Sequence, residues 1–77
     1  NAIDMYREVL RRDSSNAVAK QGLAQIAGYY EQAARDALKQ GLYTATDEFI
    51  DKGLRADPNS ENLAKLKTEL ASKEKSG

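Results

Sequence analysis

The chain has 77 residues, which is enough for one domain with a small hydrophobic core but leaves little room for a buried active site. It contains no cysteine and no histidine, so disulfide bonds, thiolate metal sites and the usual general base at neutral pH are excluded. Twelve basic residues balance twelve acidic ones, so no net charge favours nucleic acid or an anionic membrane surface. We therefore expect no enzyme activity, no cofactor and no metal site.

We expect neither a membrane-spanning segment nor a signal peptide in this sequence, because Asn1 opens directly into an amphipathic segment. No apolar run approaches the roughly 20 residues that a membrane span needs, so direct membrane insertion is not expected. Because the sequence starts at Asn1 without a methionine, we expect an excerpt from a longer protein. The charge balance does not indicate a compartment.

The first predicted helix runs from about residue 2 to residue 12. Its apolar side chains recur at three- and four-residue spacing, which places on one stripe Ala2, Ile3, Tyr6, Val9 and Leu10. Residues 13–16 then break the helix, because short polar side chains compete with the helix for backbone hydrogen bonds. We expect Ser15 or Asn16 to cap the helix that follows.

The second predicted helix is unusually long, from about residue 17 to residue 40. Helical spacing continues without interruption until Gly41 along a stripe of Leu23, Ile26, Ala27, Tyr30, Ala33, Ala34, Ala37 and Leu38. Gly22 and Gly28 lie inside it, and each costs about 1 kcal/mol relative to alanine unless another helix packs closely there. The spacing from Ala24 to Gly28 permits such an approach. Gly41 is predicted to end the helix in a left-handed conformation.

Two shorter helices complete the predicted domain, residues 1–71. The third runs from about residue 45 to residue 56, with Thr44 and Asp47 spaced as in a capping box and a buried stripe of Ala45, Phe49, Ile50, Gly53 and Leu54. Pro58 is predicted to end it and to begin the fourth helix, about residues 59–71, where a missing N–H is harmless. The stripe of the fourth helix is Leu63, Leu66 and Leu70. Residues 72–77 have nothing left to bury, so we expect a frayed tail.

An internal repeat links the two ends of the chain. Residues 2–16 align with residues 46–60, which pairs Leu10 with Leu54 and Asp13 with Asp57 at an offset of 44 residues. Repetition at such a period is typical of stacked helical hairpins.

Both aligned segments resemble the second helix of a tetratricopeptide repeat (TPR). They carry its small residue at Ala2, its large residue at Tyr6 and Ile50, and its closing sequence at residues 57–59, and the turn at residues 40–43 is also similar. A TPR repeats every 34 residues, so the second helix here would carry about ten extra residues. The resemblance implies an all-α, four-helix, right-handed superhelical stack of hairpins with an elongated second helix.

The resemblance also implies a protein–protein interaction module of a larger protein, with a preformed surface that binds a protein or peptide segment. The exposed stripe of the long helix, opposite its apolar stripe, is predicted to be partner-binding and consists of Val18, Gln21, Gln25, Tyr29, Gln32 and Asp36. Tyr29 is the strongest single candidate. The alternative is a structural spacer or self-association element within a helical repeat array, in which exposed stripes of the first and fourth helices contact neighbouring repeats or another copy. Nucleic acid is not an expected partner, because the lysines are interleaved with acids and lack nearby aromatic residues.

The spacing of the remaining charged residues indicates that they stabilise the helices and do not form a metal or binding site. Acid-first pairs four residues apart stabilise helices by a few tenths of a kcal/mol, and five occur: Glu8–Arg12, Glu31–Arg35, Glu48–Lys52, Asp51–Arg55 and Glu69–Lys73. An acidic metal site at Asp47, Glu48 and Asp51 is an alternative, although acids at a helix N-terminus are already explained by the helix dipole. A second alternative is an acidic or phosphate partner on the basic edge formed by Arg7, Arg11 and Arg12.

Overall fold

The computed structural model describes residues 1–76 and contains four α-helices. Their bounds are α1 Ala2–Arg12, α2 Ala17–Lys39, α3 Tyr43–Ala56 and α4 Glu61–Ser76. No strand occurs in this described part of the chain. The predicted all-α class with four helices is therefore confirmed. No helix within residues 1–76 is long and apolar enough to cross a membrane.

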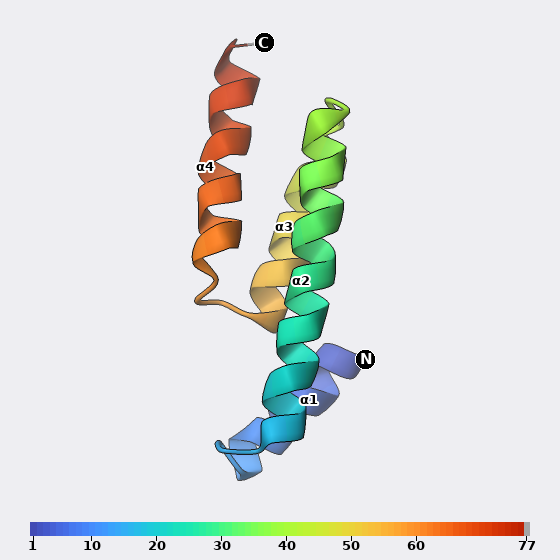
Figure 1. Cartoon of the computed structure of the whole chain (residues 1–77), viewed down its shortest axis with the longest axis vertical. Helices are drawn as coiled ribbons and strands as arrows, with labels where there is room; N and C mark the ends of the chain where they lie inside the picture. The colour runs from blue at the N-terminus through green and yellow to red at the C-terminus, as the bar shows by residue number, and fades with distance from the viewer. Residues whose placement is uncertain (77) are drawn as a thin grey trace.

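The molecule is elongated, with extents of 45 × 18 × 14 Å, and α2 runs along most of it (Figure 1). The first half of α2 lies against α1, and its second half lies against α3, which returns antiparallel to it. The last helix, α4, packs on α3 and also contacts α2. The long helix α2 thus belongs to the first hairpin, α1–α2, and also packs against the second hairpin, α3–α4.

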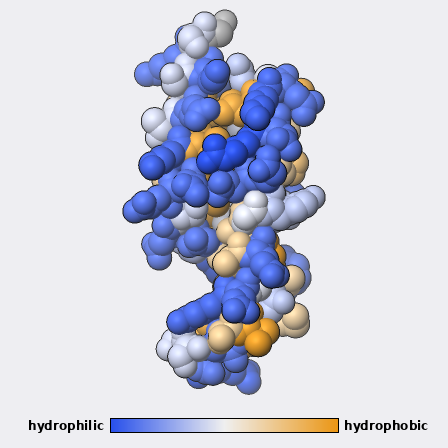
Figure 2. Space-filling model, viewed as in Figure 1, coloured by the Kyte–Doolittle hydropathy of each residue, from blue (hydrophilic) through white to orange (hydrophobic). Residues whose placement is uncertain are grey.

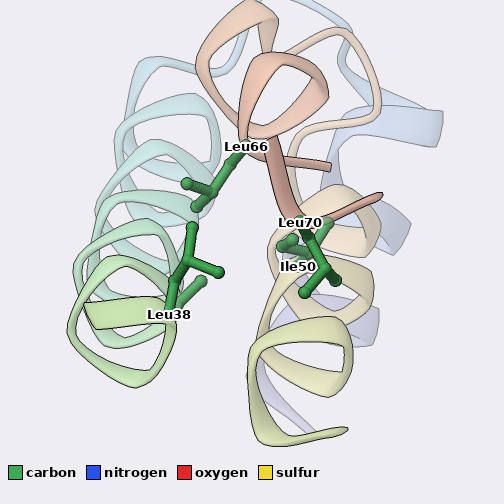
Figure 3. Close-up of a cluster of buried hydrophobic side chains, with 5 residues drawn as sticks. Leu38, Ile50, Leu66 and Leu70 are labelled. Atoms are coloured by element: carbon green, nitrogen blue, oxygen red, sulfur yellow. The ribbon is translucent and has the colours of Figure 1, made fainter. Parts of the chain in front are cut away.

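The hydrophobic core is divided into two clusters along α2. The N-terminal cluster comprises buried Leu23, Ala27 and Ala56 with the half-buried Ile3, Tyr6, Leu10 and Ile26. The C-terminal cluster comprises buried Ala34, Leu38, Ile50, Leu66 and Leu70 with the half-buried Tyr43, Phe49 and Leu54. Figure 3 shows the side chains of Leu38, Ile50, Leu66 and Leu70 between the helices. The predicted leucine stripe of α4 is buried, but α1 contributes no fully buried side chain.

The turns that close the two hairpins have the same structure. Asp13 and Asp57, which the sequence alignment paired, have φ/ψ of −142°/91° and −140°/88°. In each turn the backbone N–H of the aspartate donates to the carbonyl four residues earlier, at 2.8 Å and 2.9 Å respectively. Hydrogen bonds from Ser15 to the Asp13 carboxylate lower the pKa of that carboxyl group.

The helix that follows each turn begins with an equivalent side-chain cap. Asn16 Oδ1 accepts from the Ala19 N–H at 2.9 Å, as predicted for one of the two candidate caps. Ser60 Oγ accepts from the Leu63 N–H at 3.1 Å. The prediction that Pro58 begins the fourth helix was wrong, because Ser60 supplies the cap and α4 starts one residue later.

The connection between α2 and α3 also differs from the prediction. Gly41 has φ +75°, as expected, and the N–H of Leu42 donates to the Ala37 carbonyl at 2.9 Å, which closes a Schellman motif. This motif leaves Leu42 positioned to begin α3 directly, so the helix starts at Tyr43 and not at residue 45. The predicted capping box is absent, and Thr46 Oγ1 instead donates to the Leu42 carbonyl at 2.8 Å.

The predicted loss of helix after Ala71 was wrong for residues 72–76, which continue α4. Lysine and glutamate, which fill positions 73–75, favour helix by local propensity, so an exposed extension needs no buried contact. The Ser76 hydroxyl adds a hydrogen bond to the Ser72 carbonyl at 3.1 Å. Gly77, the last residue of the predicted tail, lies outside the described residues.

The two interior glycines of α2 have different surroundings. The ring of Tyr6 occupies the space that a Cβ at Gly22 would need, so α1 approaches α2 closely there. In the second hairpin the equivalent positions are Ile50 and Leu66, two side chains of similar size that both belong to the C-terminal cluster. The close approach that the spacing from Ala24 to Gly28 permits does not occur at Gly28, because no atom of another helix lies within 4 Å of a Cβ built at that position.

Gly28→Ala is expected to raise the free energy of unfolding by about 0.5–1 kcal/mol, because alanine restricts the unfolded chain and the site has room for the methyl group. Urea denaturation followed by circular dichroism measures the change. The matched control is Gly41→Ala, expected to lower stability by about 1 kcal/mol because its φ is positive. Destabilisation by Gly28→Ala would show that something packs on this position.

Candidate functional site

An open groove lies where α1, α2 and α3 meet. Its volume is about 610 Å³, within the range of about 300–1,000 Å³ typical of ligand sites. The middle of α2 supplies the floor through Gln25, Ile26, Tyr29 and Tyr30. One wall is the start of α1, with residues 1–4 and Arg7, and the other is the end of α3, with Lys52 and Arg55.

The floor of the groove is aromatic and held in place from below. The Tyr30 ring stacks on Phe49 with 6.2 Å between ring centroids and 29° between ring planes. Tyr29 packs edge-on against Tyr30 at 5.3 Å and 75°, yet 69 % of its surface stays exposed. Because Phe49 belongs to the C-terminal cluster, the floor is anchored to the core and needs no ligand to form.

The cations of the groove are not neutralised by neighbouring acids. The ion pairs found within residues 1–76 are Glu8–Arg11, Glu8–Arg12 and Glu31–Arg35. The predicted pairs Glu48–Lys52, Asp51–Arg55 and Glu69–Lys73 do not form in the described part of the chain. Lys52 Nζ instead lies 5.9 Å from the centroid of the Tyr30 ring, a cation–π contact.

The basic edge predicted on α1 is partly neutralised. Arg11 and Arg12 both donate to the Glu8 carboxylate, at 2.6 Å and 3.1 Å, and the bonds from Arg11 are the main reason why the pKa of Glu8 is lowered. Arg7 takes part in no ion pair within residues 1–76 and lines the groove. Of the three arginines, it is the one that can meet a groove ligand.

All six side chains predicted to bind a partner are exposed on α2, but the structure brings only two of them into the groove. Gln25 and Tyr29 line it, whereas Val18, Gln21, Gln32 and Asp36 do not. Gln32 Nε2 instead donates to Asp36 Oδ1 at 3.0 Å.

The sequence prediction missed the contributions of Ile26, Lys52 and Arg55. Ile26 was assigned to the buried stripe, and the two α3 cations were assigned to helix pairs. The spacing of three residues between Lys52 and Arg55, which puts both cations on one face of α3, was the signal in the sequence that could have found them.

The acidic residues at the start of α3 do not form the alternative metal site. Within residues 1–76, no three acidic side chains come together in an arrangement that could hold a metal ion.

A second exposed feature is apolar and lies on the α1–α2 hairpin. Figure 2 shows a mostly hydrophilic face, with hydrophobic atoms between the helices in its upper part and also in its lower part, where this hairpin lies. Met5 and Val18 are 61 % and 70 % exposed. Isolated exposed apolar side chains are common on soluble proteins, so these two indicate at most a small contact surface.

Comparison of the chain with protein-family models, curated proteins and solved structures finds no match. The resemblance to the tetratricopeptide repeat therefore stays a prediction from the residue pattern. What the groove can do follows from its own geometry: it offers an aromatic floor, hydrogen-bonding groups, and cations on both walls.

Proposed function

We propose that this chain is a protein-interaction module that binds a segment of a partner protein in the groove between α1, α2 and α3. The observation that carries the proposal is the preformed aromatic floor, in which Tyr29 is exposed while Tyr30 is stacked on the core residue Phe49. Tyrosine is enriched at protein interfaces because a large, stiff ring contributes contact area at a low cost in conformational entropy.

The proposed architecture is a TPR-like, right-handed stack of hairpins whose long helix α2 has an extra stretch. The matching turns at Asp13 and Asp57 support the repeated hairpin. A helix longer than a regular repeat would separate α1 from α3 along α2 and so open the groove at Ile26, Tyr29 and Tyr30. In this interpretation the surplus residues create the binding surface.

The proposal is tested by selecting binders from a random 12-residue peptide library on the 77-residue chain and mapping the selected peptides by amide chemical shifts. We expect the shifts to centre on Gln25, Tyr29 and Tyr30. Tyr29→Ala should weaken binding about tenfold or more, as truncation of an aromatic interface residue does. The control Gln32→Ala, on the same helix outside the groove, should bind normally. Shifts centred elsewhere, or equal losses in the two variants, would contradict the assignment.

Self-association is a second candidate function, and the exposure of Met5 and Val18 is what favours it. Light scattering over a range of concentrations distinguishes it from the first. A dimer that appears with concentration and disappears in the variant with Met5→Lys and Val18→Lys would support self-association. A monomer at all concentrations would argue against it.

A further inference from the structure

We infer that the occupant of the groove is an acidic peptide segment that carries one aromatic or large apolar side chain between its carboxylates. The inference rests on the proposed function and names the chemistry of the partner. It follows from two features of the groove, the sign of its charge and the arrangement of that charge around an apolar centre.

The charge of the groove departs from the charge of the chain. The whole sequence is neutral, yet three cations and one acid line the groove, which gives these side chains a net formal charge of +2. Arg7 stands on the α1 wall, and Lys52 and Arg55 stand on the α3 wall. Asp4 is the opposing acid. None of these four side chains forms an ion pair within residues 1–76, so the cations are available to carboxylates from outside.

The cations flank an apolar centre. Ile3 and Ile26 join the two tyrosines there, and the Lys52 ammonium is already placed over the Tyr30 ring at 5.9 Å. An apolar side chain of the partner would bury its surface against this centre. Carboxylates on either side of it would reach the two walls while remaining partly hydrated, which avoids the cost of burying an ion.

An acidic peptide fits these observations better than a nucleic acid. A nucleic-acid strand places a charge at every nucleotide and needs a basic groove along its length. Here three cations line the groove, and Glu48 and Asp51 are exposed on the same helix as Lys52. A continuous phosphate backbone would meet these acids, whereas a short peptide would not.

The test uses three acetylated and amidated pentapeptides. The first has phenylalanine flanked by two aspartates on each side, the second replaces the aspartates with asparagines, and the third replaces phenylalanine with alanine. Binding to the 77-residue chain is measured by chemical-shift titration. We expect the first peptide to bind about tenfold more tightly than either of the others, since several exposed charge pairs together, or one aromatic anchor alone, contribute on this scale.

Charge reversal on the α3 wall provides the sharper test. In the variant with Lys52→Glu and Arg55→Glu, the aspartate peptide should lose about tenfold in affinity, and a peptide with lysines in place of the aspartates should gain it. The matched control reverses Lys20 and Lys65, exposed cations that do not line the groove and form no ion pair within residues 1–76. It should bind the aspartate peptide normally. Circular dichroism checks that both variants fold. The variant with Lys52→Gln and Arg55→Gln repeats the test without introducing repulsion.

The outcomes separate this inference from the proposed function. If library-selected peptides bind in the groove but the aspartate and asparagine peptides bind equally, the function stands and the acidic partner is wrong. The same conclusion follows if an eight-nucleotide oligothymidine binds as tightly as the aspartate peptide. If neither selected peptides nor the pentapeptides shift the groove residues, the proposed function fails as well.

Discussion

Ile50→Ala is expected to lower the free energy of unfolding by about 2–5 kcal/mol, the range for truncating a large aliphatic side chain in a core. Ile50 is fully buried and lies in the C-terminal cluster with Leu38 of α2 and Leu66 of α4. Its loss therefore leaves a cavity between three helices at once. Because a domain of this size buries only about 60 % of its unfolded surface and is marginally stable, the variant should be largely unfolded at room temperature.

Urea denaturation measured by circular dichroism tests this expectation, with two controls. Ile50→Val removes one methyl group and should cost about 0.5–1.5 kcal/mol. Leu42→Ala truncates a side chain that is 52 % exposed and should change stability by less than about 0.5 kcal/mol. If Ile50→Ala and Leu42→Ala had the same effect, the three-helix cluster would not be what stabilises the fold.

Gly53→Val is expected to cost about 1–3 kcal/mol by overpacking the contact of α3 with its neighbours. A Cβ at this position would lie 2.7 Å from Leu63 Cδ1 and 3.3 Å from Tyr30 Cβ. The leucine end is flexible, but Tyr30 Cβ is attached directly to the α2 backbone and can move only with the helix. The better helix propensity of valine offsets only a few tenths of a kcal/mol.

A second change at Leu63 tests whether the two hairpins share one packing scheme. The positions equivalent to Gly53 and Leu63 in the first hairpin are Val9 and Ala19, so the large residue sits on the other helix of the pair. The variant with Gly53→Val and Leu63→Ala should therefore be less destabilised than the sum of its two single changes, by about 0.5–3 kcal/mol. Strictly additive costs, measured in the same denaturation experiment, would refute equivalent packing in the two hairpins.

Local sequence patterns predicted the helices well because they depend on neighbouring residues. The stripes at three- and four-residue spacing, the cap at Asn16 and the left-handed Gly41 are set within a few positions of the chain. The start of α3 was predicted two residues late because two ways of beginning the helix compete there, a side-chain cap at Thr44 and a Schellman motif that leads directly into the helix. The structure uses the Schellman motif, so no cap at Thr44 is needed.

The groove was less predictable because it depends on how α1 and α3 sit on α2. The sequence pattern correctly predicted that Gln25 and Tyr29 are exposed, since exposure follows from helix periodicity. It could not show that Lys52 and Arg55 would face the same space, because that requires the end of α3 to lie beside the start of α1. The pattern also assigned these two cations to ion pairs within α3. Such pairs between exposed side chains add little free energy of stabilisation, so they need not form.

The absence of any fully buried residue in α1 has a consequence for how the molecule moves. Elements with few buried contacts open at a low free energy, so α1 is the whole helix of this fold that detaches most easily. That detachment removes the wall of the groove that carries Ile3 and Arg7 while leaving the aromatic floor in place. A partner that touches both walls would therefore hold α1 closed, and its affinity would include the free energy of docking this helix.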